Sequence, residues 1–405
     1  MKKLLALTLA LVMVFALAAC GNTATPATSA EPSTPADSTE PVVESPYKVA
    51  MITDYGDITD QSFNQATYEG CLEFCNANSV DFQYYKPAGD STAERVAMVD
   101  AAIADGYNVI VMPGYAFAGT IVEVAELYPD VDFVVLDVAL GDLLGAAVGE
   151  SYDYNPDNWN LADYVDMSNV YCAVYQEELC GYMAGYAAVK LGYTHLGFMG
   201  GMAVPAVVRY GYGFVQGVDA AAGELGLTDV TVEYAYANQF FGDADITAYC
   251  DTWYQTTGVQ VVFACGGGVY TSVAEAAAKV DGKVIGVDVD QAGTIDAYGA
   301  DMTVTSAMKG LGATVNTLLT EIILNDNWAS YAGQIQTLGL VSGDDPTVNY
   351  VQIPYETTQW SDAFTQADYA ALVASMFAGT VTVSNDTSAD PAVANIVMNN
   401  AGNVK

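Results

Sequence analysis

Short apolar runs alternate with helical patterns along most of this chain, and that alternation limits its possible folds more than any other feature. We expect strands at 49–53, 80–85, 108–112 and 132–138, and helices at 62–78, 93–105 and 118–128. Apolar strands that are separated by helices predict a parallel sheet with both faces covered.

A second series of the same kind follows the first. We expect strands at 170–175, 194–199, 229–236, 259–264 and 283–288, and helices at 177–191, 205–225, 243–256 and 269–279. A chain of 405 residues exceeds one typical core. Two similar units predict an α/β protein of two doubly wound lobes with a cleft between them. Ligands of such sheets bind beyond the carboxyl ends of the strands, so the loops after each strand carry the candidate site.

The N-terminus has the pattern of an export signal. Lys2 and Lys3 precede an apolar run, residues 4–19, that is short for a membrane span and typical of a secretory signal. The residues before Cys20 resemble a bacterial lipoprotein signal, so we expect cleavage after residue 19 and lipid on Cys20. An ordinary secretory signal that contains a cysteine is the alternative. Residues 20–46, rich in Thr, Pro, Ser and Ala, predict a disordered tether.

The charge balance excludes some classes of ligand. The chain has 49 acidic and 11 basic residues, and loss of Lys2 and Lys3 would leave a balance of about −40. A nucleic-acid-binding protein needs basic patches that replace phosphate counterions, and this chain has none. A multiply charged anion is an equally poor ligand for so acidic a protein.

Cysteine and histidine usage gives no sign of a metal or a cofactor. Most of the cysteines other than Cys20 lie in apolar helix or strand patterns, which favours buried thiols, although their even number outside the cytoplasm also permits disulfides. The one histidine, His195, enters a predicted strand, and no metal-ligand spacing or histidine-based triad accompanies it. The other cysteines are Cys71, Cys75, Cys172, Cys180, Cys250 and Cys265.

The loop after the first strand is polar but contains one aromatic residue. Asp54 ends the strand, where its carboxylate can accept hydrogen bonds from ligand hydroxyls. The loop lacks the closely spaced glycines of a dinucleotide site, since only Gly56 is present. Asp60 or Ser62 can cap the next helix. From the residues alone, Phe63 is equally a core contact and a wall of a site.

Other strand ends carry similar groups. Cys265 precedes three glycines that let a backbone approach a ligand or simply form a permissive turn. Asp288 and Asp290 should point to the same face of a strand, a spacing that suits neither a glycosidase nor a metal site but does suit sugar hydroxyls. A solvated strand end is the alternative. Lys309 has small and apolar neighbours, so we expect it to pair with Asp288 or Asp290.

Three motifs together carry a family likeness. Residues 54–64, Gly286–Gln291 and Thr305–Lys309 resemble, in order and spacing, the signatures of the basic membrane protein family. The resemblance covers roughly residues 47 to 385. It implies a type I periplasmic-binding-protein fold. The implied first lobe is 47–168 plus about 296–340, the second is 169–295 plus about 341–385, and 386–405 form a tail.

The resemblance also implies a binding site. Family members of the nucleoside-binding type stack the base between two aromatic side chains, which match Phe63 and, better than Phe240, Phe241. They hold ribose through a strand-end acid, the acid of the Gly-Val-Asp motif and a lysine on a helix. The matching residues are Asp54, Asp288 and Lys309, with Asn64, Asp137 and Asp290 as further candidates. Tyr55 and the segment 310–312 depart from the family pattern.

The implied function is that of a lipid-anchored receptor on the extracytoplasmic face of the cell membrane. It binds a nucleoside, in particular a purine nucleoside, and delivers it as a monomer to ABC permease and ATPase subunits. The resemblance implies no enzyme activity, no cofactor, no nucleic-acid partner and no membrane contact beyond the lipid. The alternatives are a sugar or autoinducer binder of the same fold, with Tyr55 filling the base pocket, a ligand sensor, and a nucleoside hydrolase that uses Asp54, Asp288 and Asp290.

Overall fold

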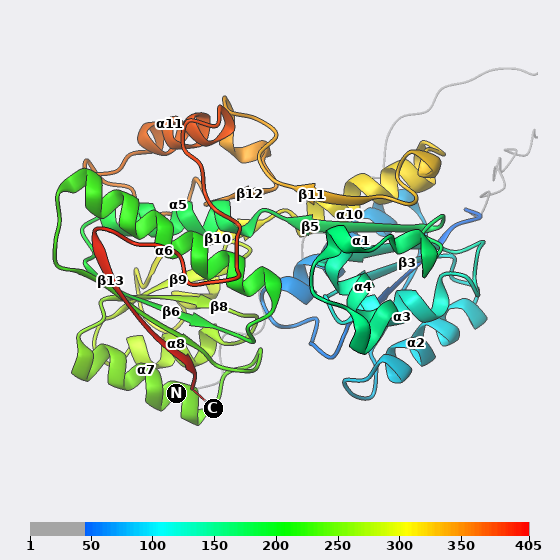
Figure 1. Cartoon of the computed structure of the whole chain (residues 1–405), viewed down its shortest axis with the longest axis horizontal. Helices are drawn as coiled ribbons and strands as arrows, with labels where there is room; N and C mark the ends of the chain where they lie inside the picture. The colour runs from blue at the N-terminus through cyan, green and yellow to red at the C-terminus, as the bar shows by residue number, and fades with distance from the viewer. Residues whose placement is uncertain (1–44, 405) are drawn as a thin grey trace, which may run out of the picture. The chain divides into compact units, whose positions relative to one another are not determined.

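The computed structural model describes residues 45–404, which contain two β-sheets covered by helices (Figure 1). The predicted signal peptide 1–19, the candidate lipidation site Cys20 and nearly all of the predicted tether lie outside the described residues. Within the described part, no helix combines the length and apolar character that a membrane crossing requires.

The first sheet is parallel throughout, with the strand order β11-β5-β4-β3-β1-β2. Its strands are β1 (Lys48–Ile52), β2 (Asp81–Tyr85), β3 (Val109–Pro113), β4 (Asp132–Leu136), β5 (Val170–Tyr175) and β11 (Ile335–Leu338). One face packs on α1 (Phe63–Asn78) and α10 (Leu311–Leu319), and the other on α2 (Thr92–Ala104), α3 (Phe117–Val124) and α4 (Leu140–Val148). The four inner strands β1, β3, β4 and β5 are buried from both sides because each face meets a helical layer, whereas the edge strands β2 and β11 stay partly exposed.

The second sheet has the order β12-β10-β9-β8-β6-β7-β13 and is parallel except for β12. Its strands are β6 (His195–Gly200), β7 (Val230–Tyr236), β8 (Val261–Cys265), β9 (Lys283–Asp288), β10 (Thr303–Lys309), β12 (Val351–Gln352) and β13 (Ile396–Asn403). Its helices are α5 (Glu177–Lys190), α6 (Pro205–Leu225), α7 (Ala244–Thr252), α8 (Tyr270–Ala277), α9 (Ala292–Ile295) and α11 (Gln366–Phe377). The pair α5 and α6 covers one face, and α7 and α8 cover the other (Figure 1).

The chain passes between the two sheets three times, and the three connections lie side by side. They follow β5, β10 and β11, and backbone hydrogen bonds join them. Gln176 N donates to Leu338 O at 2.9 Å, Gly310 N donates to Tyr350 O at 2.7 Å, and Tyr350 N donates to Gly339 O at 3.0 Å. Adjacent connections of this kind are where two lobes can rotate relative to each other, and we call these three the hinge.

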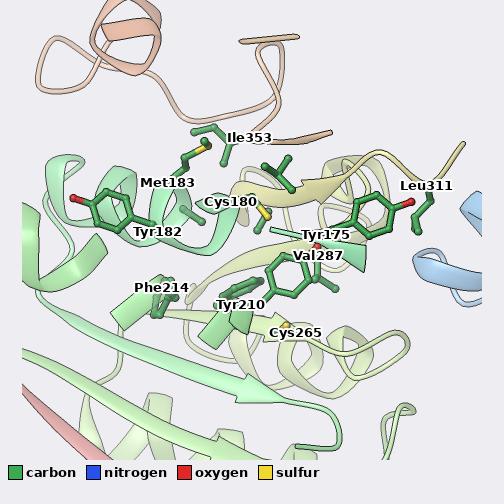
Figure 2. Close-up of a cluster of buried hydrophobic side chains, with 14 of the residues drawn as sticks. Tyr175, Cys180, Tyr182, Met183, Tyr210, Phe214, Cys265, Val287, Leu311 and Ile353 are labelled. Carbon is green, nitrogen blue, oxygen red and sulfur yellow. The ribbon is translucent and has the colours of Figure 1, made fainter. Parts of the chain in front are cut away.

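The helices α5 and α6 pack with their backbones in contact. A Cβ atom on Gly181 or Gly185 of α5, or on Gly213 or Gly217 of α6, would overlap a carbonyl oxygen of the facing helix. Figure 2 shows the core beside this helix pair, with Tyr182 and other side chains of α5 and α6 above the strands of the second sheet. The glycines are therefore required by a close approach of two backbones.

The predicted fold class is confirmed, and most predicted elements lie close to observed ones. The predicted lobe boundaries stay a prediction, but strand pairing differs from them at three places. β5 pairs within the first sheet, β10 pairs within the second, and the predicted tail 386–405 contains β13, which pairs with β7. Hydrophobic patterns predict where the strands lie in the sequence. Which strands pair depends on where the chain crosses from one sheet to the other, and the patterns do not contain that information.

Lys309 ends a strand, so its predicted place on a helix is wrong. Residues Thr303–Lys309 form β10, which is rich in the β-branched residues that favour strands. The strand runs parallel to β9, and the next helix begins only after Gly310. This position at a strand end brings Lys309 to the same edge of the sheet as Asp288.

The C-terminal segment runs along α6 before it forms β13. The Gln216 side chain pairs with the backbone of Ser384, accepting from its N at 2.8 Å and donating to its O at 2.9 Å. Asp219 accepts from the backbone N of Ala394 at 2.8 Å and of Asn395 at 2.7 Å. Specific side chains of α6 thus fix this segment and lead β13 to the edge of the sheet.

Candidate ligand-binding site

A cavity of about 340 Å³ opens at the carboxyl ends of strands from both sheets. We call it the central cavity. Its lining comes from the loops after β1, β3, β4, β7 and β8, from the ends of β9 and β10, and from α1 and α6. The predicted site residues that line it are Asp54, Phe63, Asn64, Asp137, Phe241, Asp288 and Lys309.

Asp290 does not line the cavity. It is exposed, and its carboxylate accepts from the backbone N of Ala292 at 3.1 Å and from the Thr357 hydroxyl at 2.8 Å. The predicted alternation of Asp288 and Asp290 on one face is wrong because the strand stops at Asp288. That residue has a φ of +66°, in the left-handed region, which turns the chain out of the strand.

Lys309 lies at the centre of a buried charge cluster. Its Nζ is 2.6 Å from Asp137 Oδ2, 3.5 Å from Glu177 Oε1 and 3.7 Å from Asp288 Oδ1. Burial disfavours the charge of Lys309, but the three carboxylates outweigh burial and raise its pKa. The expected pairing with Asp288 is present, but Asp137 is the nearest partner, and Asp290 is bound elsewhere.

Sequence reasoning missed Glu177 and Arg209. Glu177 is fully buried at the start of α5, and its Oε2 accepts from Arg209 Nε at 2.7 Å. Arg209 and Lys309 therefore share the same carboxylate, and each comes from a different element. One feature of the sequence could have indicated them. A cation at a strand end or in an apolar helix is expected to be buried, and a buried cation needs an acidic partner.

Asp137 has an unused hydrogen-bonding atom. Burial raises the pKa of Asp137 to about 6, and the charge of Lys309 opposes that rise. Its Oδ2 contacts Lys309, while its Oδ1 is buried without a hydrogen-bond partner among the described residues. Asp137 has a φ of +60°, a costly conformation for a residue other than glycine, which is typical of functional sites.

Asp54 and Asn64 also keep one oxygen without a hydrogen bond within the described residues. Asp54 Oδ1 accepts from the backbone N of Tyr55 at 2.6 Å and of Gly56 at 2.9 Å. Burial raises the pKa of Asp54, and these two bonds oppose the rise. Asn64 donates through Nδ2 to Asp60 at 3.0 Å, and its Oδ1 is buried without a partner. Both side chains can accept from a ligand.

The start of α1 connects the two sheets. Asp60 caps the helix, since its carboxylate accepts from the backbone N atoms of Ser62, Asn64 and Gln65. The Ser62 hydroxyl instead donates to Asp288 Oδ2 at 2.6 Å. Of the two predicted caps, Asp60 therefore serves that role, while Ser62 links the first lobe to a strand end of the second sheet.

The aromatic lining comes from both lobes. Phe63 packs against the main core and also lines the cavity, and Lys309 Nζ lies 4.6 Å from its ring centroid. Phe241 is 62% exposed, whereas Phe240 is partly buried against Gly201 and Gly266. The sequence left open whether Phe63 is a core contact or a wall of the site, and in the structure it is both.

Glu178 gives a pH-dependent prediction. It is 3% exposed on α5, and burial raises its pKa from 4.5 to about 7, with the charge of Glu177 adding to the rise. The folded protein then binds this proton more tightly than the unfolded chain. The stability from Glu178 is complete below pH 4.5 and is lost as the pH rises through 7.

We therefore expect Glu178→Gln to gain stability over the wild type as the pH rises from 5 to 8. The gain should be on the order of 2 kcal/mol, because one pKa unit corresponds to about 1.4 kcal/mol. Urea unfolding at both pH values measures it. Glu73→Gln, which removes an exposed carboxylate of α1, is the control. Equal pH slopes for the two variants would contradict the prediction.

The fold and the cavity together define a class of protein. Two α/β lobes, three adjacent connections and a polar, aromatic cavity at the strand ends are the features of a two-lobed solute-binding protein. Within residues 45–404 no group of His, Cys, Asp and Glu is placed to hold a metal ion, and the six cysteines there are buried thiols.

The chain belongs to the Bmp family, because residues 47–349 match the family model of the PnrA-like ABC transporter substrate-binding proteins. It is 27% identical over 262 residues to the ABC transporter nucleoside-binding protein BmpA of Lactococcus lactis, covering 62% of this chain and 66% of that protein. It is 25% identical over 305 residues to Basic membrane protein B of Borreliella afzelii, covering 74% and 80% of the two chains.

A solved structure shares the fold. The ABC transporter solute-binding protein of Conexibacter woesei is similar with a TM-score of 0.61 and 21% identity, over 84% of this chain and 99% of that chain. The expected family and the expected two-lobed type I fold are therefore confirmed. Members of this family are substrate-binding proteins and not enzymes.

Proposed function

We propose that this protein captures a nucleoside, in particular a purine nucleoside, in the central cavity and delivers it to an ABC permease and ATPase. It acts as a monomer held by lipid on Cys20 at the extracytoplasmic face of the membrane, and it performs no catalysis. The carrying observation is that a charged network around Lys309 and an aromatic ring, Phe63, meet in one cavity.

The base is held by aromatic stacking in this proposal. Phe63 of the first lobe forms one wall, and Phe241 of the second lobe forms the other. A cavity of about 340 Å³ falls in the range of small-molecule sites. Stacking requires only an aromatic face from the ligand, so it accepts a neutral base without a matching charge.

The sugar is held by the buried acids and Lys309. Hydroxyl groups of ribose donate to Asp137 Oδ1, to Asp288 and to Asp54, and they accept from Lys309. Asp137 Oδ1 is one of the buried atoms without a partner, so a bound hydroxyl would satisfy it. Carboxylates outnumber the one lysine of the lining, and a phosphorylated nucleoside would therefore be repelled.

Calorimetry with purified protein tests the proposal. Inosine, guanosine and adenosine should bind, the sugars galactose and ribose should bind far more weakly, and inosine should be recovered unchanged after incubation. Tighter binding of a sugar would support the alternative of a sugar or autoinducer receptor, in which Tyr55, a lining residue, takes the place of the base. Release of hypoxanthine would indicate a hydrolase.

We expect Phe63→Ala to weaken guanosine binding by roughly 5- to 150-fold, because stacking on one aromatic side chain contributes about 1–3 kcal/mol per base. Titration calorimetry measures the change. Phe377→Ala is the control, since Phe377 is 52% exposed on α11 and does not line the cavity. Equal guanosine affinity of the wild type and Phe63→Ala would rule out the stacking role.

A further inference from the structure

We propose that Tyr55 is a specificity-determining residue that limits the size of the ligand's base, because its side chain closes the central cavity across both lobes. The proposal rests on the proposed nucleoside-binding function. It adds a wall that neither the stacking pair nor the acids and lysine provide.

The backbone of Tyr55 is fixed at the end of β1. Its N donates to Asp54 Oδ1 at 2.6 Å, and the next N, of Gly56, donates to the same oxygen at 2.9 Å. A Cβ on Gly56 would overlap the Asn64 side chain, so this turn packs closely against the start of α1. The same carboxylate that lines the cavity therefore holds the backbone from which the Tyr55 side chain extends.

The Tyr55 side chain reaches the second lobe. Its hydroxyl donates to Met202 Sδ at 3.4 Å, in the loop after β6, and its ring centroid lies 6.5 Å from that of Phe240. We call the three aromatic residues Tyr55, Tyr115 and Phe240, together with the Met202 side chain that Tyr55 contacts, the aromatic bridge. Burial raises the pKa of Tyr55, so its hydroxyl stays neutral.

The partners of Tyr55 in the second lobe have little room to move away. A Cβ on Gly201 would lie 2.5 Å from the Phe240 ring, and one on Gly266 would lie 3.4 Å from it. The backbone of these two glycines therefore supports the ring from behind. Phe240 is also part of the packing around the main core. A bulky group on the ligand cannot push Phe240 back without moving this backbone.

The consequence is a limit on base size. Tyr55, Tyr115 and Phe240 all line the cavity, so a base held there faces an aromatic wall to which both lobes contribute. An unsubstituted purine fits within the wall, whereas a purine with an aryl substituent meets it. Removing the Tyr55 ring creates space, and removing only its hydroxyl does not.

The test compares adenosine with two enlarged analogues, N6-benzyladenosine and 8-benzylaminoadenosine, by titration calorimetry of the intact protein. The wild type should bind adenosine at least 100-fold more tightly than either analogue. Tyr55→Ala should reduce that ratio at least tenfold for one analogue. Tyr55→Phe, the matched control, should keep the ratio because it keeps the ring.

Met202→Ala provides a second variant on the opposite lobe, and it should also reduce the ratio if the aromatic bridge acts across the cavity. Ratios that stay unchanged in both Tyr55→Ala and Met202→Ala, with adenosine still bound, would overturn the size limit alone. A wild type that binds no nucleoside would overturn the proposed function and this inference together. A Tyr55→Phe ratio as low as that of Tyr55→Ala would assign the effect to the hydroxyl and overturn the size limit.

Discussion

Replacement of Lys309 by methionine should abolish high-affinity nucleoside binding and lower the stability of the protein by about 3–5 kcal/mol. Methionine fills the space of the lysine stem but leaves Asp137, Glu177 and Asp288 without the cation that lies within 3.7 Å of each. Unfolding in urea measures the loss of stability. Calorimetry should show a larger loss of affinity for guanosine than for guanine, since only guanosine carries the ribose.

Lys190→Met is the control for charge removal. Lys190 pairs with Glu224 at 2.7 Å, but the glutamate side chain is 54% exposed, and pairs of this kind contribute about 0–1 kcal/mol. The control should therefore bind guanosine with wild-type affinity. Equal losses of guanosine and guanine affinity in Lys309→Met would argue against a contact between Lys309 and the ribose.

Gly213→Ala should destabilise the second lobe by about 3 kcal/mol or prevent its folding. The added Cβ would overlap the carbonyl group of Glu178, and two packed helices must separate to accommodate it. The helix α5 begins at the hinge, so its displacement also shifts Glu177 and the charge cluster. Urea unfolding, followed by fluorescence, measures the effect.

Gly293→Ala is the matched control because a Cβ at that position has no atom within 4 Å. The change lies in the short helix α9, where alanine is favoured over glycine by up to about 1 kcal/mol, so the control should be neutral or stabilising. A Gly213→Ala protein as stable as the wild type would mean that α5 and α6 are farther apart than the structure places them.

The sequence was sufficient to place most of the candidate site. Asp54 and Asp288 could be proposed because the end of a parallel strand lies at the edge where ligands bind, whereas Phe63 needed the family resemblance. Asp290 was placed wrongly because alternation continues only while the strand does, and the strand ends at Asp288. The left-handed backbone of Asp288 has no mark in the sequence.

The partners of Lys309 needed the fold. Asp137 follows β4 in the first sheet, and Glu177 begins α5 after the first connection. Periodicity carries no information about which strand ends meet across a cleft, because that depends on where the chain crosses. The sheets to which β5 and β10 belong could not be predicted for the same reason, since each strand lies directly before a connection and its sheet is decided by the strands with which it pairs.

The position of β13 has a consequence for synthesis. β13 pairs with β7 from Ile396↔Val230 onward, and β11, also late in the chain, completes the first sheet beside β5. A ribosome makes residues in order, so the first sheet lacks its β11 edge until Leu338 has been made, and the second lacks β13 until nearly the whole chain has been made. The edge of β7 offers unpaired backbone groups to other chains during this interval. Chains truncated before Ile396 should therefore aggregate even though every residue of the central cavity is present.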